Sequence, residues 1–171
     1  MTEDSQRVWP VLRVAVLQAL AALVAMRRRE GGRLERDLRG RLRQLTALRQ
    51  QIARRAPAAN RGREAALRKR LELAGATPDR HDPQLLKELV LFADKSAVTE
   101  ELVRLASHGV HAAELMRADK PAGRALDFLC QEMLREINTI GSKCADGVMA
   151  RCVVDFKAQL EAVREQVQNV E

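Results

Sequence analysis

The chain has 171 residues, a net charge of +7 and very few aromatic side chains, with one Trp, three Phe and no Tyr. Residues that favour helices dominate, and Val, Ile and Thr do not gather into the alternating runs of β-strands. The composition therefore excludes a β-sheet protein. It predicts an all-α fold, a single domain over residues 8–171 with long antiparallel helices in a hairpin or bundle.

Basic and acidic residues are divided unevenly along the chain. Residues 1–75 hold 18 Lys and Arg against 7 Asp and Glu, whereas residues 76–171 hold 12 against 16. We interpret residues 8–75 as a basic long-helix arm that could follow a polyanion, and residues 82–171 as an acidic helical hairpin that could hold divalent cations. The alternative is that the arginines only solvate helix faces.

Apolar residues recur every three or four positions from Val8 to about Ala56, which predicts one long helix or two nearly continuous ones. Its stripe from Leu34 to Ile52 is close to a heptad repeat, so the helix must pair with another helix. Pro57–Arg63 is expected to break it before a short helix at Glu64–Ala74. The apolar stretch Val11–Met26 is expected to be too short to span a membrane, which predicts a cytoplasmic protein.

The second half of the chain is expected to contain three further helical segments. Asp82 precedes a predicted helix at Pro83–Ala93, and a second helix is predicted at Thr99–Arg117. Ala118–Gly123 has the composition of a sharp turn. Arg124–Glu171 is expected to be helical almost throughout, with a kink or break near residues 141–147, where glycines occur.

Cysteine and aromatic residues indicate neither a zinc site nor base stacking. Cys130, Cys144 and Cys152 lack C-x-x-C spacing, and we interpret them as small buried side chains, with the last two on one helix face. The Trp and the Phe residues are expected in the core. Nucleic-acid binding would then depend on phosphate contacts and would weaken steeply as salt rises.

The segment Asp127–Lys143 is the most informative part of the sequence because it carries many different polar groups. Glu132 and Glu136 lie one helical turn apart, and Asn138 and Ser142 continue the polar surface. Such oxygens suit a hard cation such as Mg²⁺ or Mn²⁺. The alternative for a bare pair of glutamates is a solvated face with salt bridges.

The preceding helix places Glu101, Arg104 and His108 on one face. If the two helices pack antiparallel, Glu101, His108, Glu132 and Glu136 could form a catalytic metal site between them. His108 could equally be a general base or a polar core residue. The candidate substrate-binding residues are Arg104, Arg124, Arg135, Asn138, Ser142 and Lys143.

Three motifs, DFLCQEMLREINTIGSK (Asp127–Lys143), VTEELVRLASH (Val98–His108) and REQVQNVE (Arg164–Glu171), resemble the C-terminal half of the YicC/YloC family of bacterial endoribonucleases. The resemblance extends from about Val8 to Glu171. It implies metal-dependent hydrolysis of single-stranded RNA by subunits that assemble into a hexameric ring. Nothing in the chain corresponds to the additional N-terminal α/β domain of the family.

The chain departs from the family pattern at Ala97, Gly109, Ala112, Leu134 and Ile137. Two interpretations therefore stay open. The chain is either an RNA-cleaving subunit, or its catalytic half, or it is a catalytically weak helical module for RNA binding and oligomerisation.

RNA binding and self-association complete the expectations from sequence. Single-stranded RNA is expected to bind around the arginines of Arg27–Arg43. A homo-oligomer is expected because the apolar stripes Leu34–Ile52 and Phe156–Val170 exceed what a few thin helices can bury in one subunit.

Overall fold

The computed structural model describes residues 3–73, 87, 97–118, 120–168 and 170. This part of the chain contains four helices and no strand, so the all-α prediction is confirmed. The predicted helix Pro83–Ala93 falls outside the described residues, except for Lys87. The helices are α1 (Glu3–Leu73), α3 (Thr99–Leu115), α4 (Gly123–Lys143) and α5 (Gly147–Val167).

Helix α1 is one continuous element of 71 residues, so the predicted break at Pro57–Arg63 is wrong. A proline inside a helix removes one backbone hydrogen bond. The residues that follow are mainly Ala, Arg, Leu and Glu, which are strong helix formers. Within the five residues before Pro57, Ile52 and Ala56 are buried and anchor the helix in the core.

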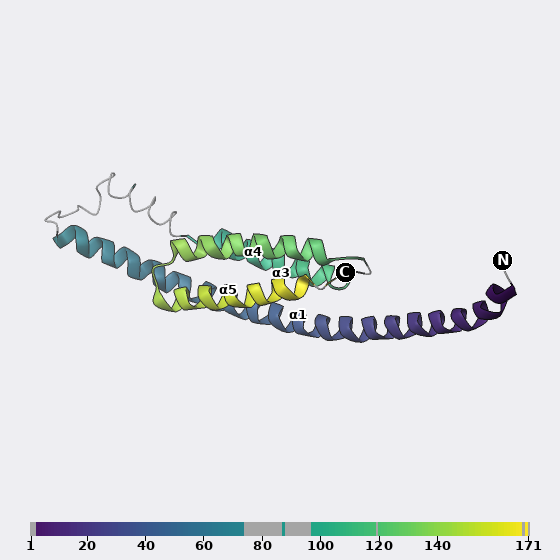
Figure 1. Ribbon diagram of the computed structural model, residues 1–171. Coiled ribbons are helices and arrows are strands. Elements are labelled where there is room, and N and C mark those ends of the chain that lie inside the picture. Colours follow the sequence, from purple (N-terminus) through teal and green to yellow (C-terminus); the bar gives the residue numbers. More distant parts are fainter. Residues whose placement is uncertain (1–2, 74–86, 88–96, 119, 169, 171) are drawn as a thin grey trace. The chain divides into compact units, whose positions relative to one another are not determined.

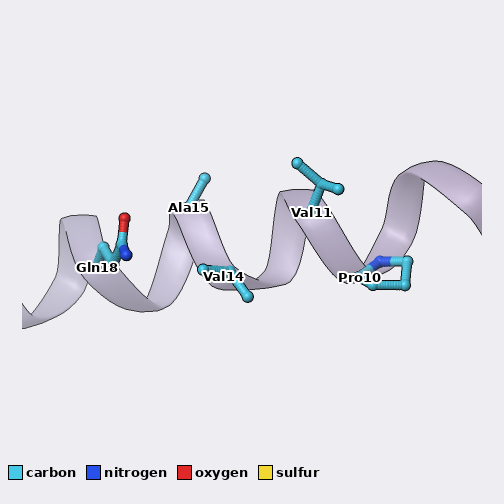
Figure 2. Close-up of a pocket in the computed structure, with 5 residues that line it drawn as sticks. All are labelled: Pro10, Val11, Val14, Ala15 and Gln18. Atoms are coloured by element: carbon cyan, nitrogen blue, oxygen red, sulfur yellow. The ribbon is translucent and has the colours of Figure 1, made fainter.

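The chain divides into two compact units, Met1–Leu38 and Arg39–Glu171. In the first unit the large apolar side chains between Val8 and Met26 are exposed, Val11 to 72%. A shallow pocket in this unit is formed by successive turns of α1 alone (Figure 2). Its lining residues are Pro10, Val11, Val14, Ala15 and Gln18.

The exposed apolar stretch corrects one expectation from sequence. The helical segment Val8–Arg70 is long and apolar enough to cross a membrane, by length and composition only, and its apolar window is not buried. An exclusion of membrane insertion by length is therefore wrong. The same pattern also fits a helix that another protein surface covers.

In the second unit α3, α4 and α5 run alongside one another (Figure 1). The predicted hairpin of α3 and α4 is confirmed, and α5 also packs against α4. The least exposed large side chains are Ile52 from α1, Ile137 and Ile140 from α4, and Phe156 from α5. The core of the unit therefore includes the part of α1 that follows Leu38.

The apolar stripes that predicted a homo-oligomer are largely covered within the chain. Leu45 and Ile52 are buried, and so are Phe156, Leu160 and Val163 on α5. That argument for self-association is therefore wrong, although the oligomeric state itself stays a prediction. The exposed apolar surface lies between residues 8 and 26 instead.

The break between α4 and α5 is stabilised by Asp146, the N-cap residue of α5. Its Oδ1 accepts hydrogen bonds from the backbone N–H groups of Val148 (3.1 Å) and Met149 (3.0 Å). The same carboxylate accepts hydrogen bonds from Nε and Nη2 of Arg55 on α1, the latter at 2.9 Å. The hydrogen bonds from Arg55 hold the pKa of Asp146 below its usual range. The predicted interruption near residues 141–147 is thus confirmed as a capped break.

The three cysteines are free. Cys144 follows the end of α4 and Cys152 lies in α5, so their predicted place on one helix face is wrong. Burial raises the pKa of the Cys130 thiol to about 11, which keeps it protonated at neutral pH.

Candidate active site between helices α3 and α4

The hairpin of α3 and α4 buries two carboxylates in its seam. Glu101 on α3 is 7% exposed and Glu136 on α4 is 5% exposed, and no other charged residue in the described part of the chain is buried. Apolar neighbours from the same two helices, Leu105 and Ile137 among them, are also buried. A buried carboxylate requires a cation or several hydrogen bonds, and each of these two has a cationic partner.

Glu101 is paired with Lys143 at one end of the seam. Lys143 Nζ donates hydrogen bonds to Glu101 Oε1 (2.6 Å) and to the carbonyl oxygen of Ala97 (2.9 Å). Burial raises the pKa of Glu101, but the hydrogen bond from Lys143, a backbone hydrogen bond and the charges of Lys143 and Arg104 together outweigh it, so the pKa lies below its usual range. The second oxygen, Oε2, is buried and accepts no hydrogen bond from the residues described.

A second ion pair lies about two turns of α4 from Lys143. There Glu136 on α4 is paired with Arg104 on α3. Arg104 Nη1 lies 3.3 Å from Glu136 Oε1, and its Nη2 lies 3.7 Å from Glu100 Oε2 on α3. One turn further along both antiparallel helices lie His108 on α3 and Glu132 on α4. Both are half-buried. The seam therefore carries a row of acid–base side chains along its length.

The predicted metal ligands Glu101, His108, Glu132 and Glu136 are chemically suited to a hard cation. In the described part of the chain, however, no group of three or more His, Cys, Asp or Glu side chains is placed to hold one metal ion. Glu101 and Glu136 are already neutralised by Lys143 and Arg104. The four residues thus do not fit a metal in this arrangement, and we derive no chemical step through one. A metal requirement stays a prediction.

The predicted substrate-binding residues fall into two groups. Arg104 and Lys143 form the ion pairs of the seam. The other four are exposed along α4. Helical spacings of three and four residues place Phe128 and Gln131, which are also exposed, on the same face. We call this set the exposed row of α4: Arg124, Phe128, Gln131, Arg135, Asn138 and Ser142.

Phe128 was missed as a surface residue. It is 59% exposed, and Trp9 is 57% exposed, so the expectation that these aromatic side chains lie in the core is wrong for both. The signal in the sequence is spacing, because Phe128 follows Arg124 by four positions and precedes Arg135 by seven. Only Phe156 occupies the core among the Phe residues described.

Arg164 is the other residue that sequence reasoning left without a role. Its Nε donates a hydrogen bond to Asp127 Oδ1 (3.0 Å), and Gln131 Nε2 donates to Asp127 Oδ2 (2.7 Å). The Asp127 hydrogen bond raises the pKa of Arg164 above its usual value. The closing motif of the sequence thus fixes the start of the Asp127–Lys143 motif.

The family model and the relatives that match this chain all indicate the same family. A family model described as "Endoribonuclease YicC-like, C-terminal" matches residues 52–171. A protein of Clostridioides difficile named "Probable endoribonuclease YicC" is 38% identical over 170 residues, which cover 99% of this chain and 58% of the relative. A protein of the same name from Haemophilus influenzae is 33% identical over 153 residues, 89% of this chain and 52% of the relative. The chain thus spans just over half the length of these relatives.

Proposed function

Because the chain belongs to the YicC-like endoribonuclease family, we propose that it takes part in the endonucleolytic cleavage of single-stranded RNA. The seam of α3 and α4 is the observation that supports this site. It lies inside the matched region and gathers two buried carboxylates, two cations, a histidine and a further glutamate along one hairpin.

The side chains of the seam have the chemistry that phosphodiester hydrolysis needs. His108 and Glu132 are half-buried and can act as a general base that takes a proton from the attacking water. The Arg104 side chain is 60% exposed although it is paired with Glu136, so its guanidinium can also meet a phosphate. Lys143 and Glu101 then hold the two helices in register.

The proposal also includes a homo-oligomer and a basic path for the RNA backbone. The exposed apolar side chains between Val8 and Met26 supply surface that self-association could cover. The arginines of Arg27–Arg43 supply charge for phosphate contacts, with an affinity that falls as salt rises. Both proposals concern the first half of the chain, whereas the proposed catalytic site, the seam of α3 and α4, belongs to the second half.

Glu132→Gln should reduce the cleavage rate of a labelled single-stranded RNA at least about 100-fold, the loss typical of a missing general base. The melting temperature and RNA affinity should stay close to those of the unchanged chain, because Glu132 is only half-buried and the seam hydrogen bonds of Glu101 and Glu136 do not use it. Gel-resolved cleavage, with and without EDTA, gives the rate and the metal requirement together.

Glu114→Gln is a matched control, since Glu114 is exposed near the end of α3, outside the seam. It should cleave at the unchanged rate. An unchanged rate in Glu132→Gln would remove Glu132 from the proposed site. RNA binding without cleavage by the unchanged chain would favour the binding-module interpretation. Cleavage that survives EDTA would argue against a metal requirement.

A further inference from the structure

The exposed row of α4 combines features that packing does not explain. The opposite face of the helix is apolar and buried, with Leu126, Leu129, Met133, Ile137 and Ile140 in the core. The exposed row carries an aromatic ring, two guanidinium groups, two amides and a hydroxyl. A helix face that only meets water needs none of this variety.

Phe128 is the unusual member of the row. A single exposed apolar side chain is ordinary on a protein surface. Here, however, Arg124 lies one turn before the ring, and Gln131 and Arg135 lie one and two turns after it. Phe128 and Arg135 are about 10 Å apart along the helix axis, at a rise of about 1.5 Å per residue. An aromatic face and a cation are therefore presented together over a short distance.

The electrostatics of α4 favour an anionic ligand on this row. Asp127 is engaged by Arg164 and Gln131, and Glu136 is buried against Arg104. Within the described residues, the exposed charges of α4 are thus the guanidinium groups of Arg124 and Arg135, and the remaining carboxylate, Glu132, is half-buried towards the seam. The amide groups of the row add hydrogen-bond donors and acceptors, because Gln131 uses its Nε2 in the bond to Asp127 and keeps its Oε1 to accept.

We infer that Phe128 stacks on a nucleobase of single-stranded RNA while Arg124 and Arg135 contact the phosphates on either side of it. This inference rests on the proposed function and adds a base-binding contact to it. Unstacked bases of single-stranded RNA bind to aromatic faces, and arginine binds phosphate with paired N–H groups. Stacking tolerates any base, so the contact supplies affinity without strong sequence preference.

The test compares ring and aliphatic side chains at position 128 in the full chain. Binding of a fluorescein-labelled oligouridylate is measured in EDTA at low salt, to suppress metal-dependent cleavage, and gels confirm that the probe stays intact. Phe128→Leu should bind roughly ten-fold more weakly, whereas Phe128→Tyr should bind nearly as the unchanged chain does. Val154→Ala is the matched control, because Val154 is 65% exposed on α5, and it should have no effect.

An oligonucleotide of abasic residues separates stacking from backbone contacts. On this probe Phe128→Leu and the unchanged chain should bind equally. The inference is overturned if Phe128→Leu binds oligouridylate normally, or if it weakens both probes alike. It is also overturned if Phe128→Leu binds RNA more weakly and light scattering shows that it forms a smaller oligomer than the unchanged chain. That result would assign Phe128 to a subunit interface. Ring-dependent binding by a chain that cleaves no RNA would refute the proposed function and leave the inference standing.

Discussion

Lys143→Met should lower the free energy of unfolding by about 3 kcal/mol at pH 7, the lower end for one partner lost from a buried ion pair. The lower end applies because the Lys143 side chain is 27% exposed, whereas that of Glu101 is 9% exposed. The substitution keeps an apolar stem but leaves the Glu101 carboxylate buried without its cation. Urea unfolding followed by circular dichroism measures the loss.

The free energy of unfolding lost in Lys143→Met should become smaller as the pH falls. The pKa of Glu101 lies below its usual range in the folded chain, since burial raises it but Lys143 lowers it further. A lowered pKa stabilises the fold above the unfolded pKa, about 4.3, and this contribution is lost as pH falls through the folded pKa. Removing Lys143 removes its hydrogen bond and its charge, both of which lower the pKa of Glu101, so this pKa should rise. The difference between Lys143→Met and the unchanged chain should therefore shrink from pH 7 towards pH 4.

Two further variants complete this experiment. Lys69→Met, an exposed position on α1, should change the free energy of unfolding by less than about 0.5 kcal/mol. The double variant Glu101→Gln with Lys143→Met should recover part of the loss, because no buried charge remains. Equal stability of Lys143→Met and the unchanged chain at pH 7 would mean that the pair is not buried in solution.

Ile52→Ala should lower the free energy of unfolding by about 3 kcal/mol, because it leaves a cavity at a fully buried site. Ile52 belongs to α1, so the loss would show that this part of the long helix is built into the core of the second unit. Leu20→Ala is the matched control in the first unit. Leu20 is 51% exposed, and its truncation should cost less than about 0.5 kcal/mol.

Two results would contradict these expectations for Ile52→Ala and Leu20→Ala. If Ile52→Ala unfolds at the same urea concentration as the unchanged chain, α1 does not contribute to the core at this position. If Leu20→Ala is strongly destabilising, the apolar stretch between Val8 and Met26 is covered in solution, and the oligomeric state should then be measured on the same sample.

Periodicity predicted the helical fold and the α3–α4 hairpin, because each helix buries one apolar face and a turn rich in Pro and Gly separates them. The continuity of α1 through Pro57 could not be predicted in the same way. A proline predicts a local break, whereas burial of Ile52 and Ala56 and strong helix formers beyond it decide the outcome.

The seam was predicted as a meeting of two faces but not as a set of ion pairs. Sequence spacing gives the face of each helix, but not which side chain of one helix lies opposite which of the other. Arg104 and Lys143 were therefore assigned to RNA, whereas they neutralise Glu136 and Glu101. Phe128 shows the same difficulty, because it adjoins the buried Leu129 in sequence but points to solvent, about 100° around the helix.

Asp146 connects two parts of the chain that lie far apart in the sequence. One carboxylate holds the first turn of α5 and the Arg55 side chain, 91 positions earlier in the sequence. Loosening of α1 near Arg55 would thus deprive the α5 cap of the partner that holds its carboxylate in position. Amide hydrogen exchange at Val148 and Met149 should therefore become faster when α1 loosens near Arg55. In that case the first turn of α5 and this part of α1 form one cooperative unit.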